Sequence, residues 1–280
     1  MKNYQPMFMP KELDRKRMEV PKDYIKEIIY QYSRFAKRHD LLYDNWDVAN
    51  EKLALGLHTF FRAQRRKIRS VLDCGCGTGM AAIGLKKRGY DVIGLDLSRG
   101  MLREALKNAR RVGVDAPFIQ GDWRECSMYF QKKFDCVMCR GNSLSHISGK
   151  DDLILTVRNF YKLLNENGLC YIGLRDWDRI LKEKKLFTVI TNTPKSFNHK
   201  KMVVLYFWDF NQDNVTINVI FIIKNGEVIR KEVYPISHWP ISRSVLENVM
   251  REVGFDDVHK VDVDGDEINQ EKYNIIIGYR

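Results

Sequence analysis

Two kinds of hydrophobic pattern follow one another along the chain. In the first seventy residues, apolar side chains recur three or four positions apart, which is the spacing of one face of an α-helix. The pattern occurs twice, at Ile25, Ile28, Ile29, Tyr32 and Phe35 and again at Leu53, Leu57, Phe60 and Phe61. We therefore predict that residues 1–69 form a largely helical N-terminal cap.

From Ser70 onward, short apolar runs alternate with segments of helical periodicity. The predicted strands cover 70–74, 91–97, 116–120, 134–139 and 169–174. The intervening helices are predicted over 80–88, from Ser98 to Gly113 and over 151–164. Strands without polar alternation are typical of a parallel sheet covered on both faces. Right-handed crossovers then make the sheet doubly wound.

The pattern changes after Arg175. Residues 200–235 are rich in strand formers, and Asn225-Gly226 is a type I′ hairpin signal between the runs 220–223 and 228–233. A helix over 242–253 and two strands near 258–263 and 273–279 follow. We predict an α/β fold, a Rossmann-like doubly wound seven-stranded sheet, mostly parallel, with the N-terminal helical cap and a small antiparallel β insert. The expected domains are the cap (1–69), a cofactor-binding core (70–175), an insert over the active site (176–240) and the rest of the core (241–280).

Composition restricts the class of protein. The 280 residues are 44% hydrophobic and 11% aromatic, which is typical of a globular protein with a full core. No run of about 18 apolar residues occurs, and the first ten residues lack the layout of a signal peptide. We expect a soluble cytoplasmic protein without a membrane partner.

The formal net charge of +11 is one that an acidic partner such as nucleic acid would complement. The basic residues are scattered, however, and the densest runs, at 62–69 and 182–185, are interrupted or short. Charge alone indicates non-specific attraction. A nucleic-acid partner therefore stays an alternative.

The cysteines are candidates for a metal site. Cys136 and Cys139 have the spacing of half a zinc site, but no second matching pair is present in the sequence. Four of the six cysteines fall in predicted buried strands and a fifth, Cys76, in the turn after one, where free cysteine acts as a small hydrophobic residue. We expect no metal.

A glycine-rich turn follows the first predicted strand. The segment 73–79 reads D-C-G-C-G-T-G, and its glycines allow the backbone to turn sharply and approach a nucleoside. A dinucleotide fingerprint requires a third glycine at the place of Met80. Asp96 ends the second strand, as expected for an acid that binds ribose, and Asp122-Trp123 follows the third strand and suits an adenine. The alternative is that these are turn and N-cap residues only.

These features together resemble the class I S-adenosylmethionine-dependent methyltransferases, over about 70–175. A narrower resemblance, to glycine N-methyltransferase and the glycine/sarcosine methyltransferases, rests on R-G-N-S-L-S-H at 140–146, similar to that family's G-N-S-x-x-H. It also rests on L-R-D-W-D-R-I-L at 174–181, similar to H-R-N-Y-D-Y-I-L, and on Tyr234-Pro235 and Tyr43. The family often has an arginine seven residues after that tyrosine, which binds the methionine carboxylate, whereas this chain has Asn50.

The resemblance implies S-adenosylmethionine as cofactor, with S-adenosylhomocysteine as product, and a small-molecule amine as the methyl acceptor. Expected cofactor-binding residues are Asp73, Gly75, Gly77, Gly79, Asp96, Leu97, Asp122, Trp123, Arg140 and His146. Expected catalytic residues, which hold the substrate carboxylate, are Asn142, Arg175, Tyr43 and Tyr234. For these residues the alternatives are helix caps at Asn142 and His146 and packing aromatics at the two tyrosines.

Methyl transfer of this kind depends mainly on aligning a neutral amine with the methyl–sulfur axis and on excluding water. Such positioning contributes on the order of 7–11 kcal/mol. Two other functions stay open: an RNA or protein methyltransferase, and a regulatory protein that binds S-adenosylmethionine without turnover. Homo-oligomerisation also stays open.

Overall fold

The computed structural model describes residues 22–190, 195–197, 200–268 and 271–280. Its main sheet has seven strands in the order β11-β14-β5-β4-β1-β2-β3. The strands from β5 to β3 are parallel, while β14 is antiparallel to both of its neighbours. Their bounds are β1 Ser70–Cys74, β2 Asp91–Asp96, β3 Phe118–Gln120, β4 Phe134–Cys139, β5 Leu164–Leu174, β11 Asp256–Val261 and β14 Asn274–Tyr279. The predicted seven-stranded, mostly parallel sheet is confirmed.

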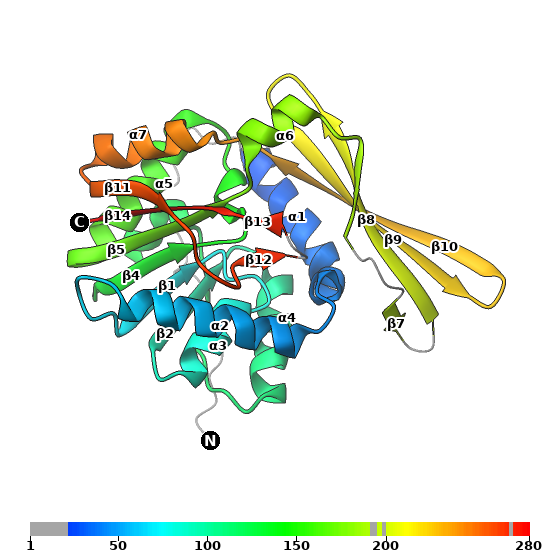
Figure 1. Ribbon diagram of the computed structural model, residues 1–280, viewed down its shortest axis with the longest axis horizontal. Coiled ribbons are helices and arrows are strands. Elements are labelled where there is room, and N and C mark those ends of the chain that lie inside the picture. Colours follow the sequence, from blue (N-terminus) through cyan, green and yellow to red (C-terminus); the bar gives the residue numbers. More distant parts are fainter. Residues whose placement is uncertain (1–21, 191–194, 198–199, 269–270) are drawn as a thin grey trace.

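Helices cover both faces of this sheet because its strands are apolar on both sides. Val71 packs into one hydrophobic cluster, and the next residue, Leu72, packs into the other. The first cluster includes apolar residues of α2 (Trp46–Arg62), α3 (Met80–Lys87) and α4 (Arg99–Arg111), and the second includes those of α5 (Lys150–Leu163) and α7 (Arg243–Val253). Figure 1 shows these two layers of helices. None of the described helices is both long and apolar enough to cross a membrane.

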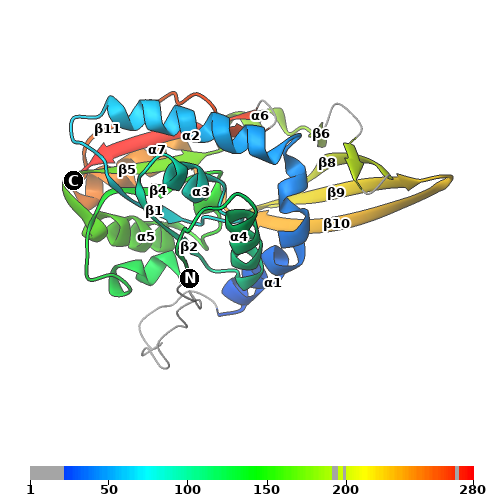
Figure 2. The same cartoon turned by 90° about the horizontal axis from the view of Figure 1, so that it is seen from below.

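A second, antiparallel sheet follows β5 and the short helix α6 (Trp177–Glu183). The sequence pattern predicted an antiparallel insert here, but it did not predict α6. Its path runs β10-β9-β8-β6, with β7 also paired to β8. The bounds are β6 Phe187–Val189, β7 Lys195–Phe197, β8 Lys200–Phe210, β9 Val215–Asn225 and β10 Val228–His238. Figures 1 and 2 show this sheet projecting from one side of the main sheet. A small two-stranded sheet, β12 (Glu267–Ile268) with β13 (Glu271–Lys272), lies near the C-terminus.

The hairpin between β9 and β10 corrects one prediction. Asn225 pairs with Val228, so the two turn residues are Gly226 and Glu227. Only Gly226 of these two has a positive φ, of 58°. A type I′ turn requires a positive φ at both central residues. The predicted type I′ turn at Asn225-Gly226 is therefore wrong, although a two-residue turn does join the strands.

The N-terminal helix α1 (Lys22–His39) joins the two sheets. It packs against α4 of the core on one side and against β10 of the second sheet on the other. A short 3₁₀ turn, η2 (Asp40–Leu42), then leads to α2. The first 21 residues of the predicted helical cap lie outside the described residues. The carboxyl ends of β1, β2 and β4 therefore face a space that α1 borders.

Candidate functional site

The glycine turn after β1 lines a cavity with about 1080 Å³ of empty space, part of it open to solvent. Both Gly75 and Cys76 donate their backbone N–H groups to the carbonyl of Leu95 on β2, at 2.7 and 3.1 Å. Gly75 has a φ of 71°, and a Cβ there would lie 2.9 Å from the Cβ of Ser143. The same Cβ would lie 3.0 Å from the Trp123 ring. The turn therefore requires glycine at this position.

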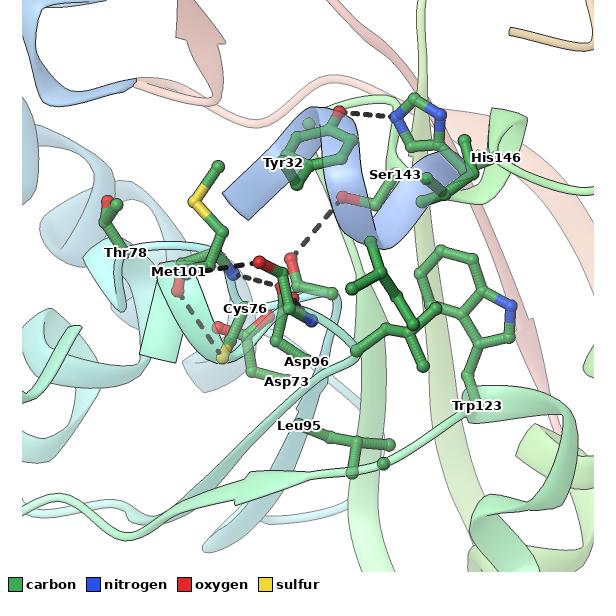
Figure 3. A pocket seen from close by; sticks show the side chains of 18 of the residues that line it. Tyr32, Asp73, Cys76, Thr78, Leu95, Asp96, Met101, Trp123, Ser143 and His146 are labelled. Carbon is green, nitrogen blue, oxygen red and sulfur yellow. Dashed lines mark hydrogen bonds between the residues drawn. The ribbon is translucent and has the colours of Figure 1, made fainter. Parts of the chain in front are cut away.

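Asp96 connects the end of β2 to the glycine turn. Its carboxylate accepts the backbone N–H of Gly77 on one oxygen and that of Ser98 on the other, both at 2.8 Å. Burial nevertheless raises the pKa of Asp96. Figure 3 shows Asp96 beside Asp73 on the floor of the cavity. A carboxylate with two oxygens accepts about four hydrogen bonds, so lone pairs remain for a ligand hydroxyl.

Asp122 and Trp123 lie after β3 and line the same cavity. Arg124 donates from Nε and Nη2 to the Asp122 carboxylate at 2.7 and 2.6 Å. The same guanidinium reaches Asp152 at 3.2 Å. The Trp123 indole is packed near Gly75, and its Nε1–H is buried without a partner. The structure thus engages both carboxylate oxygens of Asp122 within the protein, and it leaves the indole donor available.

Arg140 comes directly after β4, and Asp73 is the last residue but one of β1. Asp266 accepts hydrogen bonds from Arg140 Nε and Nη2 at 3.0 and 2.6 Å. It also accepts the Tyr171 hydroxyl at 2.5 Å. Burial raises the pKa of Asp73 to about 7, and its Oδ1 has no hydrogen-bond partner. Both residues line the cavity. The unpartnered Oδ1 of Asp73 and the guanidinium of Arg140, which is bonded to Asp266 through Nε and Nη2, therefore face the same space.

His146 has a defined tautomer. Its Nδ1 lies 3.0 Å from the carbonyl oxygen of Ser237, which can only accept, so Nδ1 carries the proton. Burial lowers the pKa of His146 to about 4, and the ring is therefore neutral. Its Nε2 must then accept the hydroxyl of Tyr32, at 2.5 Å. Figure 3 shows this pair above the cavity.

A second cavity, with about 450 Å³ of empty space, adjoins the first. Asn142 and Arg175 line it. The Asn142 Oδ1 accepts the backbone N–H of Arg175 and the indole N–H of Trp177, both at 3.0 Å, while its Nδ2 is buried without a partner. The Arg175 guanidinium lies 5.2 Å from the ring centre of Tyr206. Tyr32, His39 and Gly141 line both cavities.

The structure brings together most of the predicted site residues, with two exceptions. Asp73, Gly75, Gly77, Asp96, Leu97, Asp122, Trp123, Arg140, His146 and Tyr43 line the first cavity. Gly79 does not: it precedes α3, and a Cβ there would lie 2.8 Å from the Phe118 ring, so it serves packing. Tyr234 lines neither cavity, and its hydroxyl donates to Glu232 at 2.9 Å. Asn50 is buried and donates to the Met80 carbonyl at 2.6 Å.

The sequence pattern gave Tyr32 only a packing role and gave no role to His39, Tyr206 or His238. All four line the second cavity. They come from α1, β8 and β10, which lie far apart in the sequence. No local pattern marks them, because their meeting depends on how α1 and the second sheet dock on the core.

The order of strands and the glycine turn with Asp96 define a nucleoside-binding methyltransferase site. Comparison with known proteins agrees: the family described as "Methyltransferase domain" matches residues 71–168. The chain contains a class I S-adenosylmethionine-dependent methyltransferase domain, and S-adenosylmethionine is its cofactor.

Two relatives of the same name are similar to this chain. The chain is 29% identical over 195 residues to the glycine/sarcosine N-methyltransferase of Aphanothece halophytica, an alignment covering 68% of this chain and 67% of that protein. It is 34% identical over 148 residues to the enzyme of the same name from Parasynechococcus marenigrum, covering 53% of this chain and 51% of that protein. The second match thus spans about half the length of the relative.

The fold also matches a solved structure, an S-adenosylmethionine-dependent methyltransferase from Clostridium acetobutylicum. The TM-score is 0.67 at 19% identity, and the match covers 89% of this chain and 97% of that one. At this level of identity the likeness concerns the fold.

Proposed function

We propose that this protein transfers a methyl group from S-adenosylmethionine to the amine nitrogen of a small carboxylate-bearing molecule, in the class of glycine, sarcosine and related amino acids. The observation that carries the proposal is the junction of the two cavities. Tyr32, His39 and Gly141 line both of them, so the two cavities are adjacent at these residues, and the proposal places the acceptor amine there, next to the cofactor. The names of the first relatives, glycine/sarcosine N-methyltransferases, support the same class of acceptor.

The first cavity fits the cofactor on the chemistry of its lining. S-adenosylmethionine supplies an activated methyl group on a sulfonium when it is bound. The turn at Gly75 admits the nucleoside closely, and Asp96 has lone pairs left for the ribose hydroxyls. The unpartnered Oδ1 of Asp73 suits the ammonium group, and Arg140 suits the carboxylate of the methionine part.

Arg140 takes the role that the resemblance assigned to another position. Its Nε and Nη2 donate hydrogen bonds to Asp266, and Nη1 has no hydrogen bond to the described residues. Asn50 is buried against Met80 and carries no charge. A cation at the end of β4 therefore supplies the charge that α2 lacks at Asn50.

The second cavity orients the acceptor. A planar guanidinium, that of Arg175, suits the two oxygens of a carboxylate, and the rings of Tyr206 and Trp208 hold it at 5.2 and 5.5 Å. The free N–H of the Asn142 amide is buried nearby and can donate to the same carboxylate. The amine then faces Gly141 and Tyr32, at the junction with the first cavity.

Tyr32 and His146 position the amine rather than remove its proton. The neutral His146 uses Nε2 to accept the Tyr32 hydroxyl and Nδ1–H to reach Ser237, so it has no lone pair left for the acceptor. The Tyr32 oxygen keeps lone pairs, which can accept an amine N–H and direct the nitrogen lone pair toward the cofactor. Positioning of this kind is what the transfer requires.

The predicted domain boundaries separate the parts of the chain around the acceptor from those around the cofactor. We propose that the cap (1–69) and the insert (176–240) enclose the acceptor, while 70–175 and 241–280 form the cofactor-binding core. Tyr32 of α1 and Tyr206 and His238 of the second sheet line the acceptor cavity. Enclosure excludes water from the reacting groups.

The test is methyl transfer from labelled S-adenosylmethionine to a panel of small amines, with and without a carboxylate, and to bulk RNA. Label in carboxylated amines, with little in the matched amines that lack the carboxylate, is the expected result. Transfer to RNA alone, or to amines irrespective of the carboxylate, would overturn the proposal. A chain that binds the cofactor tightly and methylates nothing in the panel would do the same and favour a regulatory role.

A further inference from the structure

The wall of the acceptor cavity that β9 and β10 contribute is aliphatic. Ile217, Val219 and Ile236 line the cavity and are at most 4% exposed. They are neighbours on one face, because Ile217 pairs with Ile236 and lies two residues from Val219 on the same strand. The burial of β9 alternates between buried and half-buried positions from Val215 to Phe221. One apolar surface, with no charged side chain on it, therefore faces the acceptor.

Polar groups of the cavity border this aliphatic patch, and His238 lies on the same face of the sheet, two residues from Ile236. Arg175 is held against Tyr206 and Trp208 of β8, and these two residues pair with Val219 and Ile217. Asn142 lies at the end of β4, beside Gly141 at the junction with the first cavity. The cavity thus presents three features to a ligand: a cation, a polar junction and, beside the cation, an aliphatic wall.

An α-amino acid has three substituents that match these three features. Its carboxylate corresponds to Arg175, its amine to the junction at Gly141, and its side chain to the aliphatic wall. We infer that the preferred acceptor is an α-amino acid with an aliphatic side chain, of the size of alanine to leucine, rather than glycine. This inference rests on the proposed function and adds the class of side chain to it.

Two physical arguments favour a side chain at the wall. Glycine has no side chain with which to cover Ile217, Val219 and Ile236, which line the cavity. Each methylene group that leaves water for an apolar wall improves binding about fourfold. Ile217, Val219 and Ile236 offer no hydrogen bond to a charged or strongly polar side chain, which loses its hydration against them.

The experiment is a series of acceptors that differ only in the side chain: glycine, alanine, 2-aminobutyrate, norvaline and leucine, with aspartate as the polar control. We expect kcat/KM to rise about fourfold for each added carbon until the cavity is full, with aspartate below alanine. A series in which glycine is the best acceptor would overturn the inference and leave the proposed function intact.

Failure of the proposed function gives a different result, namely no transfer to any carboxylated amine. Calorimetric binding of leucine and glycine to the chain saturated with S-adenosylhomocysteine then decides the inference separately. Tighter binding of leucine supports the aliphatic wall, and equal binding of the two overturns it.

A matched pair of variants ties the preference to the wall. Val219→Thr places a hydroxyl on the cavity face, while Ile222→Thr makes a similar change on the same strand at an exposed position. We expect the ratio of kcat/KM for leucine over glycine to fall about fivefold or more in Val219→Thr and to keep its value in Ile222→Thr. An equal ratio in the two variants would place the preference elsewhere.

Discussion

The hydroxyl of Tyr32 and the Nε2 of His146 lie 2.5 Å apart at the junction of the two cavities. These residues are 114 positions apart in the sequence and come from α1 and from the turn after β4. His146 in turn reaches the backbone of β10 through Nδ1. A single hydrogen-bonded chain therefore links the N-terminal helix, the core and the second sheet at the place where we propose that the methyl group is transferred.

Removing the Tyr32 hydroxyl tests whether this link positions the acceptor. We expect Tyr32→Phe to lower kcat by about 10²-fold, the effect of losing one well-placed polar group, with little change in cofactor affinity. Tyr30→Phe is the matched control, since Tyr30 lies on the same helix and is exposed. Kinetics with the preferred amine and calorimetry with S-adenosylhomocysteine measure the two effects. A kcat for Tyr32→Phe equal to that of the control would remove Tyr32 from the mechanism.

The buried His146 makes stability depend on pH. Its native pKa of about 4 lies below the ordinary 6.5, so the unfolded chain binds a proton between these values that the native chain does not. The stability contribution is fully present above pH 6.5 and is lost as the pH falls toward 4, by roughly 3 kcal/mol in all.

Comparing the wild type with His146→Gln isolates this contribution, because the nearby His238, whose pKa burial also lowers, is present in both proteins. The free energy of unfolding, measured by denaturant titration from pH 4 to pH 7.5, should rise more steeply in the wild type. Curves that stay parallel over this range would show that His146 is not buried and neutral.

Arg175 should distinguish acceptor from cofactor. We expect Arg175→Ala to raise KM for the acceptor about 100-fold or more, since a carboxylate loses a charged, buried partner, while cofactor affinity stays within about threefold. Arg179→Ala, on the exposed face of α6, is the control. Equal losses of acceptor and cofactor binding in Arg175→Ala would refute its assigned role.

Arg140 should recognise the amino-acid part of the cofactor. Arg140→Lys keeps a charge for Asp266 but cannot form the guanidinium fork that serves two partners. We expect it to weaken S-adenosylhomocysteine about tenfold and to leave 5′-methylthioadenosine, which lacks the amino acid, unchanged. Calorimetry with both ligands measures this difference. A similar loss for both would mean that Arg140 acts only through the fold.

Two glycines with positive φ provide a direct test of the glycine turn. In Gly75→Ala the new Cβ meets Ser143 and Trp123 at 2.9 and 3.0 Å, whereas at Gly226 it meets nothing within 4 Å. Both changes should cost stability of about 1–2 kcal/mol from the left-handed backbone. Only Gly75→Ala should also abolish cofactor binding, because the ring of Trp123 must move. Retained cofactor affinity in Gly75→Ala would count against the close approach.

The sequence by itself determined the core. Apolar runs at 70–74 and 134–139, without polar alternation, can only be buried on both faces, and the helical spacing between them requires parallel crossovers. The glycine turn and Asp96 could also be predicted from the sequence, because a turn and the acid at the next strand end depend on local backbone geometry. Features such as this turn and this acid depend on residues that are close together in the sequence.

The proposed acceptor site, by contrast, depends on tertiary packing, as do several of the roles proposed within the cofactor site. Tyr32 carries a helical packing pattern, yet it meets His146 only because α1 docks between the core and β10. Tyr234 has the sequence context of a site residue but bonds to Glu232 instead. Ile217 forms part of an aliphatic wall only because its strand pairs with β10, which brings Ile236 beside it. Such contacts depend on how distant elements pack, and the spacing of residues along the chain does not specify that packing.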